Sequence, residues 1–185
     1  MPRLSTLISR SLNRPFSTLS AITCAILLAG CSALPSAIDS SSQSTTYWRD
    51  ALESAQKTST RTVRGKMHFV CSYDSQGFYW RFSHPSGSLY RDNTKVGTLN
   101  ADWSISAKDG TILKMSILAT GPRRNTTHLP DAVFKATSPK NGTFAGIRYI
   151  ERTNAKGGMP LTKCSASQQS QHLSRPFEAD YTFWH

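Results

Sequence analysis

The side chains best suited to binding a ligand belong to one basic loop and one tryptophan. Arg123 and Arg124 stand together in the longest polar loop, and His128 follows in the same loop. Planar guanidinium groups suit phosphate or carboxylate ligands. Trp103 belongs to an alternating stretch and offers a ring on which a sugar could stack. We take Trp103, Arg123, Arg124 and His128 as candidate binding residues; a solvated loop and core packing of the tryptophan are the alternatives.

Motifs for catalysis or metal binding are absent from the sequence. It contains no Gly-x-Ser-x-Gly, no His-Glu-x-x-His and no glycine-rich phosphate loop before a helix. The five histidines include no pair at metal-ligand spacing, so we assign no catalytic residue, no metal and no other cofactor. Four carboxylates could serve a glycoside hydrolase, but their spacing singles out no pair. They are Asp102, Asp109, Glu151 and Asp180. We therefore favour a non-catalytic protein and keep an envelope glycan hydrolase as the alternative.

Cys31 follows a basic segment and a short apolar block, in the order that is typical of a secretory signal. The apolar block, residues 21–28, is too short to span a bilayer, which takes about 20 residues. Leu28-Ala29-Gly30-Cys31 resembles the lipobox of bacterial lipoproteins. That resemblance implies cleavage before Cys31, a diacylglycerol on its sulfur and an acyl chain on its amino group. Ser32 after the cysteine implies sorting to the outer membrane.

Two of the four cysteines then remain in the exported domain, because Cys24 leaves with the signal and Cys31 carries lipid. In an oxidising compartment two thiols without a competitor should pair. We therefore predict a structural disulfide between Cys71 and Cys164.

Composition divides the chain into four parts. Residues 1–30 are the signal, 31–46 the acylated cysteine with a Ser/Thr-rich flexible tether, 47–60 a short helix or linker, and 61–185 a β-domain. The signal holds three of the 22 Lys and Arg and none of the 11 Asp and Glu, so the mature chain carries a net charge of +8. In an exported protein this charge favours anionic headgroups or glycans over nucleic acid.

Alternation of apolar and polar residues dominates the chain from residue 62 onward. Val63, Met67 and Phe69 alternate with Arg64 and His68, which is the period of a half-buried strand. Further alternating runs are separated by Gly, Pro, Asn and Asp, as in a hairpin-rich domain. We predict an all-β fold, an antiparallel β-sandwich or partly open barrel of about seven to nine short strands. One short N-terminal helix is expected after the tether.

Residues 62–185 also resemble an exported family known as domain of unknown function 3455. The resemblance rests on pieces that occur in order along the chain. They are Phe69-Val70-Cys71, Phe78-Tyr79-Trp80-Arg81-Phe82, Val96-Gly97, Trp103, Asp109-Gly110-Thr111, Ile147-Arg148-Tyr149-Ile150-Glu151-Arg152-Thr153, Gly157-Gly158-Met159-Pro160 with Cys164, and Ala179-Asp180-Tyr181-Thr182-Phe183-Trp184. The resemblance implies an all-β domain with paired cysteines and no assigned activity.

Together these features predict a membrane-anchored lipoprotein of the bacterial envelope whose β-domain is a binding or interaction module. The expected partners are the membrane, through the lipid on Cys31, and an anionic envelope glycan, a lipid headgroup or an envelope protein. Nucleic acid is not expected as a partner.

Overall fold

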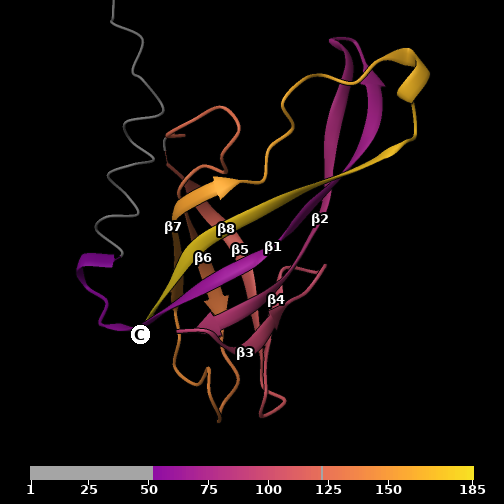
Figure 1. Cartoon of the computed structure of the whole chain (residues 1–185). Coiled ribbons are helices and arrows are strands. Elements are labelled where there is room, and N and C mark those ends of the chain that lie inside the picture. The colour runs from indigo at the N-terminus through magenta and orange to yellow at the C-terminus, as the bar shows by residue number, and fades with distance from the viewer. Residues whose placement is uncertain (1–51, 122) are drawn as a thin grey trace, which may run out of the picture. The chain divides into compact units, whose positions relative to one another are not determined.

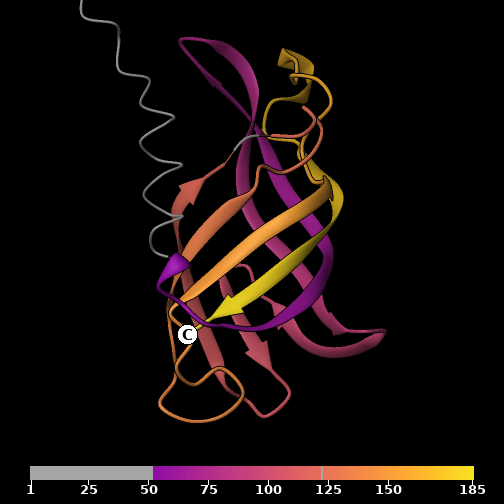
Figure 2. The same ribbon diagram turned by 90° about the vertical axis from the view of Figure 1, so that its left-hand side faces the viewer.

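The computed structural model describes residues 52–185 except Pro122, and the eight strands in that range form one antiparallel sheet. The strands follow one another in sequence order, and β8 pairs with β1, so the sheet closes into a ring (Figure 1, Figure 2). The elements are β1 (Lys57–Asp74), β2 (Gly77–Arg91), β3 (Thr94–Leu99), β4 (Ser104–Ala107), β5 (Ile112–Thr120), β6 (Ala132–Thr137), β7 (Tyr149–Gly157), the 3-10 helix η1 (Ala166–Gln168) and β8 (His172–Trp184). The signal, Cys31 and the tether lie outside the described residues.

The predicted all-β antiparallel fold is confirmed, with four differences in detail. The sheet closes fully, and β1 and β2 have 18 and 15 residues and are not short. Residues 57–60, which we placed in a helix or linker, belong to β1, because Lys57 already pairs with Trp184. Of the expected N-terminal helix, only Leu52 and Glu53 are helical among the described residues. None of the described helical segments is long and apolar enough to cross a membrane.

The core fills the inside of the ring. Alternate residues of each strand point inward, as Val63 and Met67 do on β1 and Ala179 and Tyr181 on β8. Tyr181 is fully buried, and its ring stacks on that of the equally buried Phe134 with centroids 6.3 Å apart. Each fully buried apolar side chain contributes about 1.5–3 kcal/mol. The rows of inward-facing side chains along the strands, which we call inward columns, therefore stabilise the closed ring.

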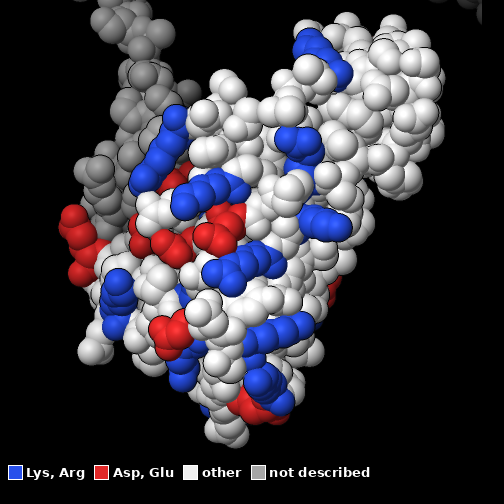
Figure 3. Space-filling view, viewed as in Figure 1, with Lys and Arg blue, Asp and Glu red and all other residues white. Residues whose placement is uncertain are grey.

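β1 and β2 continue beyond β3 as an arm, and β8 stays paired with β1 in it as far as the Val70–His172 pair. β2 pairs with β3 only from Gly87 onward, whereas its pairing with β1 runs back to Gly77. The Cys71–Cys164 disulfide, with Cα atoms 5.9 Å apart, joins the arm to the segment before β8. The predicted pairing of these cysteines is thus confirmed. Figure 3 shows that the lobe formed by the arm carries few charged side chains compared with the ring.

Two glycines face each other at the base of the arm. Gly65 of β1 pairs with Gly87 of β2, and a Cβ atom on Gly65 would overlap the carbonyl oxygen of Ser86. The two backbones therefore approach more closely than any side chain allows, at the point where the strands leave the ring.

Candidate binding site

Two arginines end the inward columns of β1 and β2, at the end of the ring opposite the arm. Val63 and Leu89 are paired and buried, and Thr62 pairs with Tyr90. Arg61 and Arg91 are therefore the next positions along these two strands. Because residues two apart share a face of a strand, both arginines stem from the face that carries the core.

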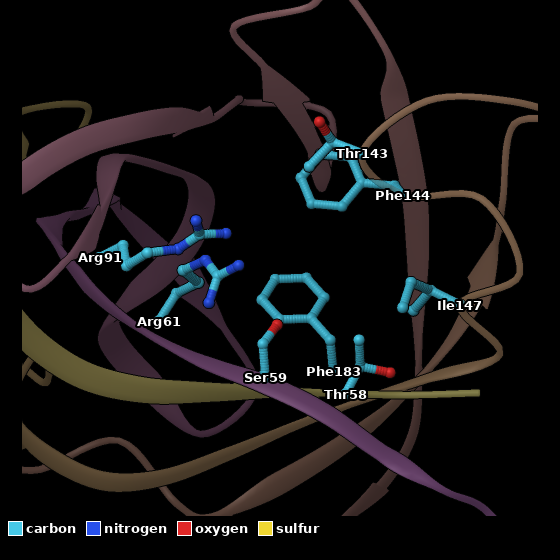
Figure 4. A pocket seen from close by; sticks show the side chains of 8 residues that line it. All are labelled: Thr58, Ser59, Arg61, Arg91, Thr143, Phe144, Ile147 and Phe183. Carbon is cyan, nitrogen blue, oxygen red and sulfur yellow. The ribbon is translucent and has the colours of Figure 1, made fainter.

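The two guanidinium groups open onto a pocket of about 390 Å³, which we call the two-arginine pocket. It is lined by Thr58, Ser59, Arg61, Arg91, Thr143, Phe144, Ile147 and Phe183. Figure 4 shows the guanidinium groups side by side and directed toward the ring of Phe183. Within the described part of the chain neither group has a carboxylate at ion-pair distance. Arg61 Nη1 donates a hydrogen bond to the carbonyl of Thr60 at 3.0 Å.

The positive charges of the two arginines repel each other in this pocket. Arg61 is half-buried and Arg91 is exposed. Burial lowers the pKa of Arg61, the charge of Arg91 lowers it further, and Asp92 acts in the opposite direction. A guanidinium remains protonated in spite of such effects. The pocket therefore holds two like charges, and the charge of a bound anion would offset their repulsion.

The opposite wall of the pocket is apolar. Phe144 and Phe183 are 6% and 2% exposed, and their rings stack with centroids 5.6 Å apart. Ile147, 3% exposed, completes this wall. An apolar wall opposite paired cations suits a ligand with an anionic group on an apolar body.

Asp109 fixes the loop that supplies this wall. Its Oδ2 accepts hydrogen bonds from the backbone N–H and the hydroxyl of Thr143, at 2.8 and 2.7 Å. Its Oδ1 accepts the corresponding pair from Thr111, at 3.0 and 2.6 Å. These bonds, first of all those from Thr111, hold the pKa of Asp109 well below its usual range. Asp109, one of the four carboxylates considered for catalysis, is thus a positioning residue for Thr143 and Phe144.

The predicted basic loop forms part of a second pocket, of about 570 Å³, which we call the loop pocket. Arg124 and His128 line it, together with Asn125, Asn154, Ala155, Lys156 and Asp180. Arg123 is exposed and does not line it. The loop lies against the end of β7, where Leu129 N donates to Gly157 O at 2.9 Å and Met159 N to Thr127 O at 3.1 Å. The structure therefore brings two of the four predicted residues together.

Trp103 lies apart from both pockets and packs against the core. Its ring centroid is 5.6 Å from that of Phe82 and 5.7 Å from that of Phe134. Its φ of 60° lies in the left-handed region, which is strained for a bulky residue. In the structure Trp103 therefore packs against the core, which was the alternative to sugar stacking, although its side chain is only partly buried.

Among the histidines and the remaining candidate carboxylates, His128 and Asp180 share the loop pocket, and the other ones named here make separate contacts. His68 stacks on His84 with centroids 4.4 Å apart, and both of its nitrogens contact serine hydroxyls, of Ser86 and Ser174, at 2.8 Å. No group of three His, Cys, Asp or Glu in the described range could hold a metal ion. Asp102 accepts from Ser104, at 2.6 Å from its hydroxyl, and Asp180 accepts from Asn154 at 3.0 Å. Burial, with Asp131 nearby, raises the pKa of Glu151.

Comparison with known proteins shows a similarity over the second half of the domain. The model of a family described as protein of unknown function (DUF3455) matches residues 102–185. This supports the resemblance noted in the sequence for the second half of the domain, and the quoted pieces before residue 102 lie outside the match. No curated protein and no solved structure shows a significant match to the chain.

Sequence reasoning missed the two-arginine pocket, although a signal for it exists. The alternation of β1 includes residues before position 62, and Arg61 lies two residues before the buried Val63 on the same face of the strand. The same step forward from Leu89 reaches Arg91. A charged residue that follows a row of buried apolar residues on one face of a strand indicates that the core ends there and that this end of the ring is open to solvent.

Proposed function

We propose that this protein is a lipid-anchored binding module of the bacterial envelope that holds an anionic group attached to an apolar body. The shared chemistry of such ligands is a phosphate or carboxylate next to hydrocarbon, as in an acidic lipid. The observation that carries the proposal is the convergence of Arg61 and Arg91 on one pocket with the Phe144–Phe183 stack. Guanidinium forks match phosphate and carboxylate oxygens, and the aromatic wall suits the hydrocarbon.

The place of the pocket in the chain supports a ligand from the membrane. Thr58 and Ser59 line the pocket at the start of β1, so it lies where the chain enters the domain. The proposed anchor, Cys31, precedes β1 by fewer than 30 residues. In this proposal the acyl chains on Cys31 hold the protein at the outer membrane, and the tether lets the mouth of the ring reach headgroups of the same bilayer.

Binding of soluble short-chain lipids to the mature protein tests the ligand chemistry. The probes are dihexanoyl phosphatidic acid, dihexanoyl phosphatidylcholine and inorganic phosphate, titrated by calorimetry. We expect phosphatidic acid to bind more tightly than either of the other two, because only it offers both an accessible anionic phosphate and hydrocarbon. Arg61→Gln/Arg91→Gln should weaken its binding by tenfold or more, since a hydrogen bond to a charged group contributes about 1.5–3 kcal/mol.

A charge-matched control separates the pocket from the net charge. Arg81→Gln/Lys135→Gln removes the same charge from exposed positions that line neither pocket, and its affinity should equal that of the parent protein. Equal loss in both double variants, or equal binding of all three probes, would show that the pocket is not a headgroup site. The anchor is tested by Cys31→Ala, which should release the protein in soluble form; a variant that stays in the membrane fraction with its signal removed contradicts the anchor.

A further inference from the structure

We infer that the loop pocket is a second binding site and that its ligand is a sugar acid, a hydroxylated ring carrying one carboxylate. No residue lining it also lines the two-arginine pocket, so the inference does not depend on the function proposed above. Its volume of about 570 Å³ is in the range of small-molecule sites, which is roughly 300–1,000 Å³.

The positive charges of this pocket are available to a ligand. Lys156 is exposed and forms no ion pair within the described residues; Glu178, opposite it on β8, pairs with Arg64 at 2.8 Å. Arg124 contacts Asp131 only at 3.6 Å, and its side chain is 61% exposed. Two cations from different segments, the basic loop and β7, thus face one space. This arrangement favours an anionic group on the ligand.

The carboxylate of Asp180 restricts which anion fits. Ionised Asp accepts hydrogen bonds and donates none. Its Oδ2 accepts one bond, from Asn154 Nδ2 at 3.0 Å, which leaves further acceptor positions on the wall of the pocket. A bare phosphate dianion has no donor for them and would be repelled. A ligand with hydroxyl groups beside its acidic group supplies donors to Asp180 and a carboxylate to Lys156 and Arg124.

The backbone of β7 presents Asn154 at this site. The β7–β8 register shifts between Thr153 and Lys156, and Asn154 has a φ of 54° inside this bulge. Bulges re-aim side chains, and non-glycine residues in the left-handed region occur where the surroundings hold them. Here the bulge turns the Asn154 amide onto Asp180. An amide next to a carboxylate offers a donor and an acceptor to neighbouring hydroxyls of one ring.

Titration of the mature protein with digalacturonic acid, followed by calorimetry and by NMR of backbone amides, tests the inference. The dimethyl ester of the same disaccharide is the control ligand, because it keeps the hydroxyls and loses both charges. We expect the acid to bind with shifts confined to residues around the loop pocket, and the ester to bind at least about tenfold more weakly. Lys156→Gln and Asp180→Asn should each weaken binding of the acid by a similar factor, whereas Lys135→Gln, an exposed lysine on β6, should not.

Three results would overturn the inference. The first is equal binding of acid and ester, which removes the role of the cations. The second is tighter binding of the acid by Asp180→Asn, as expected if Asp180 only repels anions. The third is the absence of shifts at the loop pocket at saturating ligand. Each variant is compared by its melting temperature with the parent protein, so that unfolding is not taken for lost binding. Arg61→Gln/Arg91→Gln should bind the acid normally, which distinguishes failure here from failure of the proposed headgroup site.

Discussion

Removal of the Cys71–Cys164 disulfide should strongly destabilise the protein, and the size of the effect follows from chain topology. The bond joins residues 93 positions apart and encloses β2 through β7. Closing a loop of that length in the unfolded chain corresponds to about 4–5 kcal/mol in the chain-entropy model. Domains of this size are stable by only about 5–15 kcal/mol, so this bond accounts for a large share.

The perturbation is Cys71→Ala/Cys164→Ala, and the assay is equilibrium unfolding in urea. Alanine is preferred to serine because Cys71 and Cys164 are 2% and 7% exposed, and a buried hydroxyl without a partner would add its own penalty. With an m-value of about 2 kcal/mol/M, the midpoint should fall by roughly 2 M. The parent protein unfolded in the presence of a reductant should follow the curve of the variant. A midpoint shift below about 0.5 M, near 1 kcal/mol, would refute the entropic reasoning and place the role of the bond in the arm alone.

Two other substitutions test local features. Gly65→Ala should destabilise the protein by about 1–3 kcal/mol or more, because its Cβ would overlap Ser86 at the base of the arm; an unchanged melting temperature would show that the strands separate easily there. Asp109 has a lowered pKa in the folded state, so it stabilises the fold above its unfolded pKa of about 3.9 and loses that effect as the pH falls toward its folded pKa. Asp109→Asn should therefore have a lower free energy of unfolding than the parent at neutral pH. Its free energy of unfolding should also fall less when the pH is lowered from above to below about 4. Urea unfolding at several pH values measures this, and an identical acid dependence of both proteins would contradict it.

Local patterns in the sequence predicted much of this fold because they report local physics. The alternation of Val63, Met67 and Phe69 gave the inner face of β1, and the count of free thiols gave the disulfide. Closure of the ring was not predicted, because the pairing of β1 with β8 joins residues more than 100 positions apart and has no short-range signal. The left-handed φ of Trp103 was missed for a related reason, since residues with small or polar side chains usually occupy such positions.

The candidate sites were harder to predict than the fold, because each is assembled from distant segments. In the loop pocket, the sequence indicated Arg124 and His128 as binding residues, and Asp180 only as one of four carboxylates without a partner. It did not indicate Lys156, and the bulge of β7 and its pairing with β8 bring both residues to the basic loop. In the two-arginine pocket, Thr143 and Phe144 come from the segment between β6 and β7, and the bonds from Thr143 to Asp109 hold this segment at the pocket.

The two arginines at the mouth of the ring are better explained by binding than by stability. Each is the next residue on the inner face after a buried apolar one, Val63 on β1 and Leu89 on β2, so a leucine at each would add apolar surface next to the core. Instead the chain places two cations there, with the pKa of Arg61 lowered by burial and by its neighbour. Charged residues with perturbed pKa values in a cleft are candidates for a binding role, as proposed for these two. If Arg61→Gln/Arg91→Gln melts at or above the temperature of the parent protein and yet loses phosphatidic acid, stability and binding are separated at these positions; a large loss of stability would instead make the arginines part of the fold.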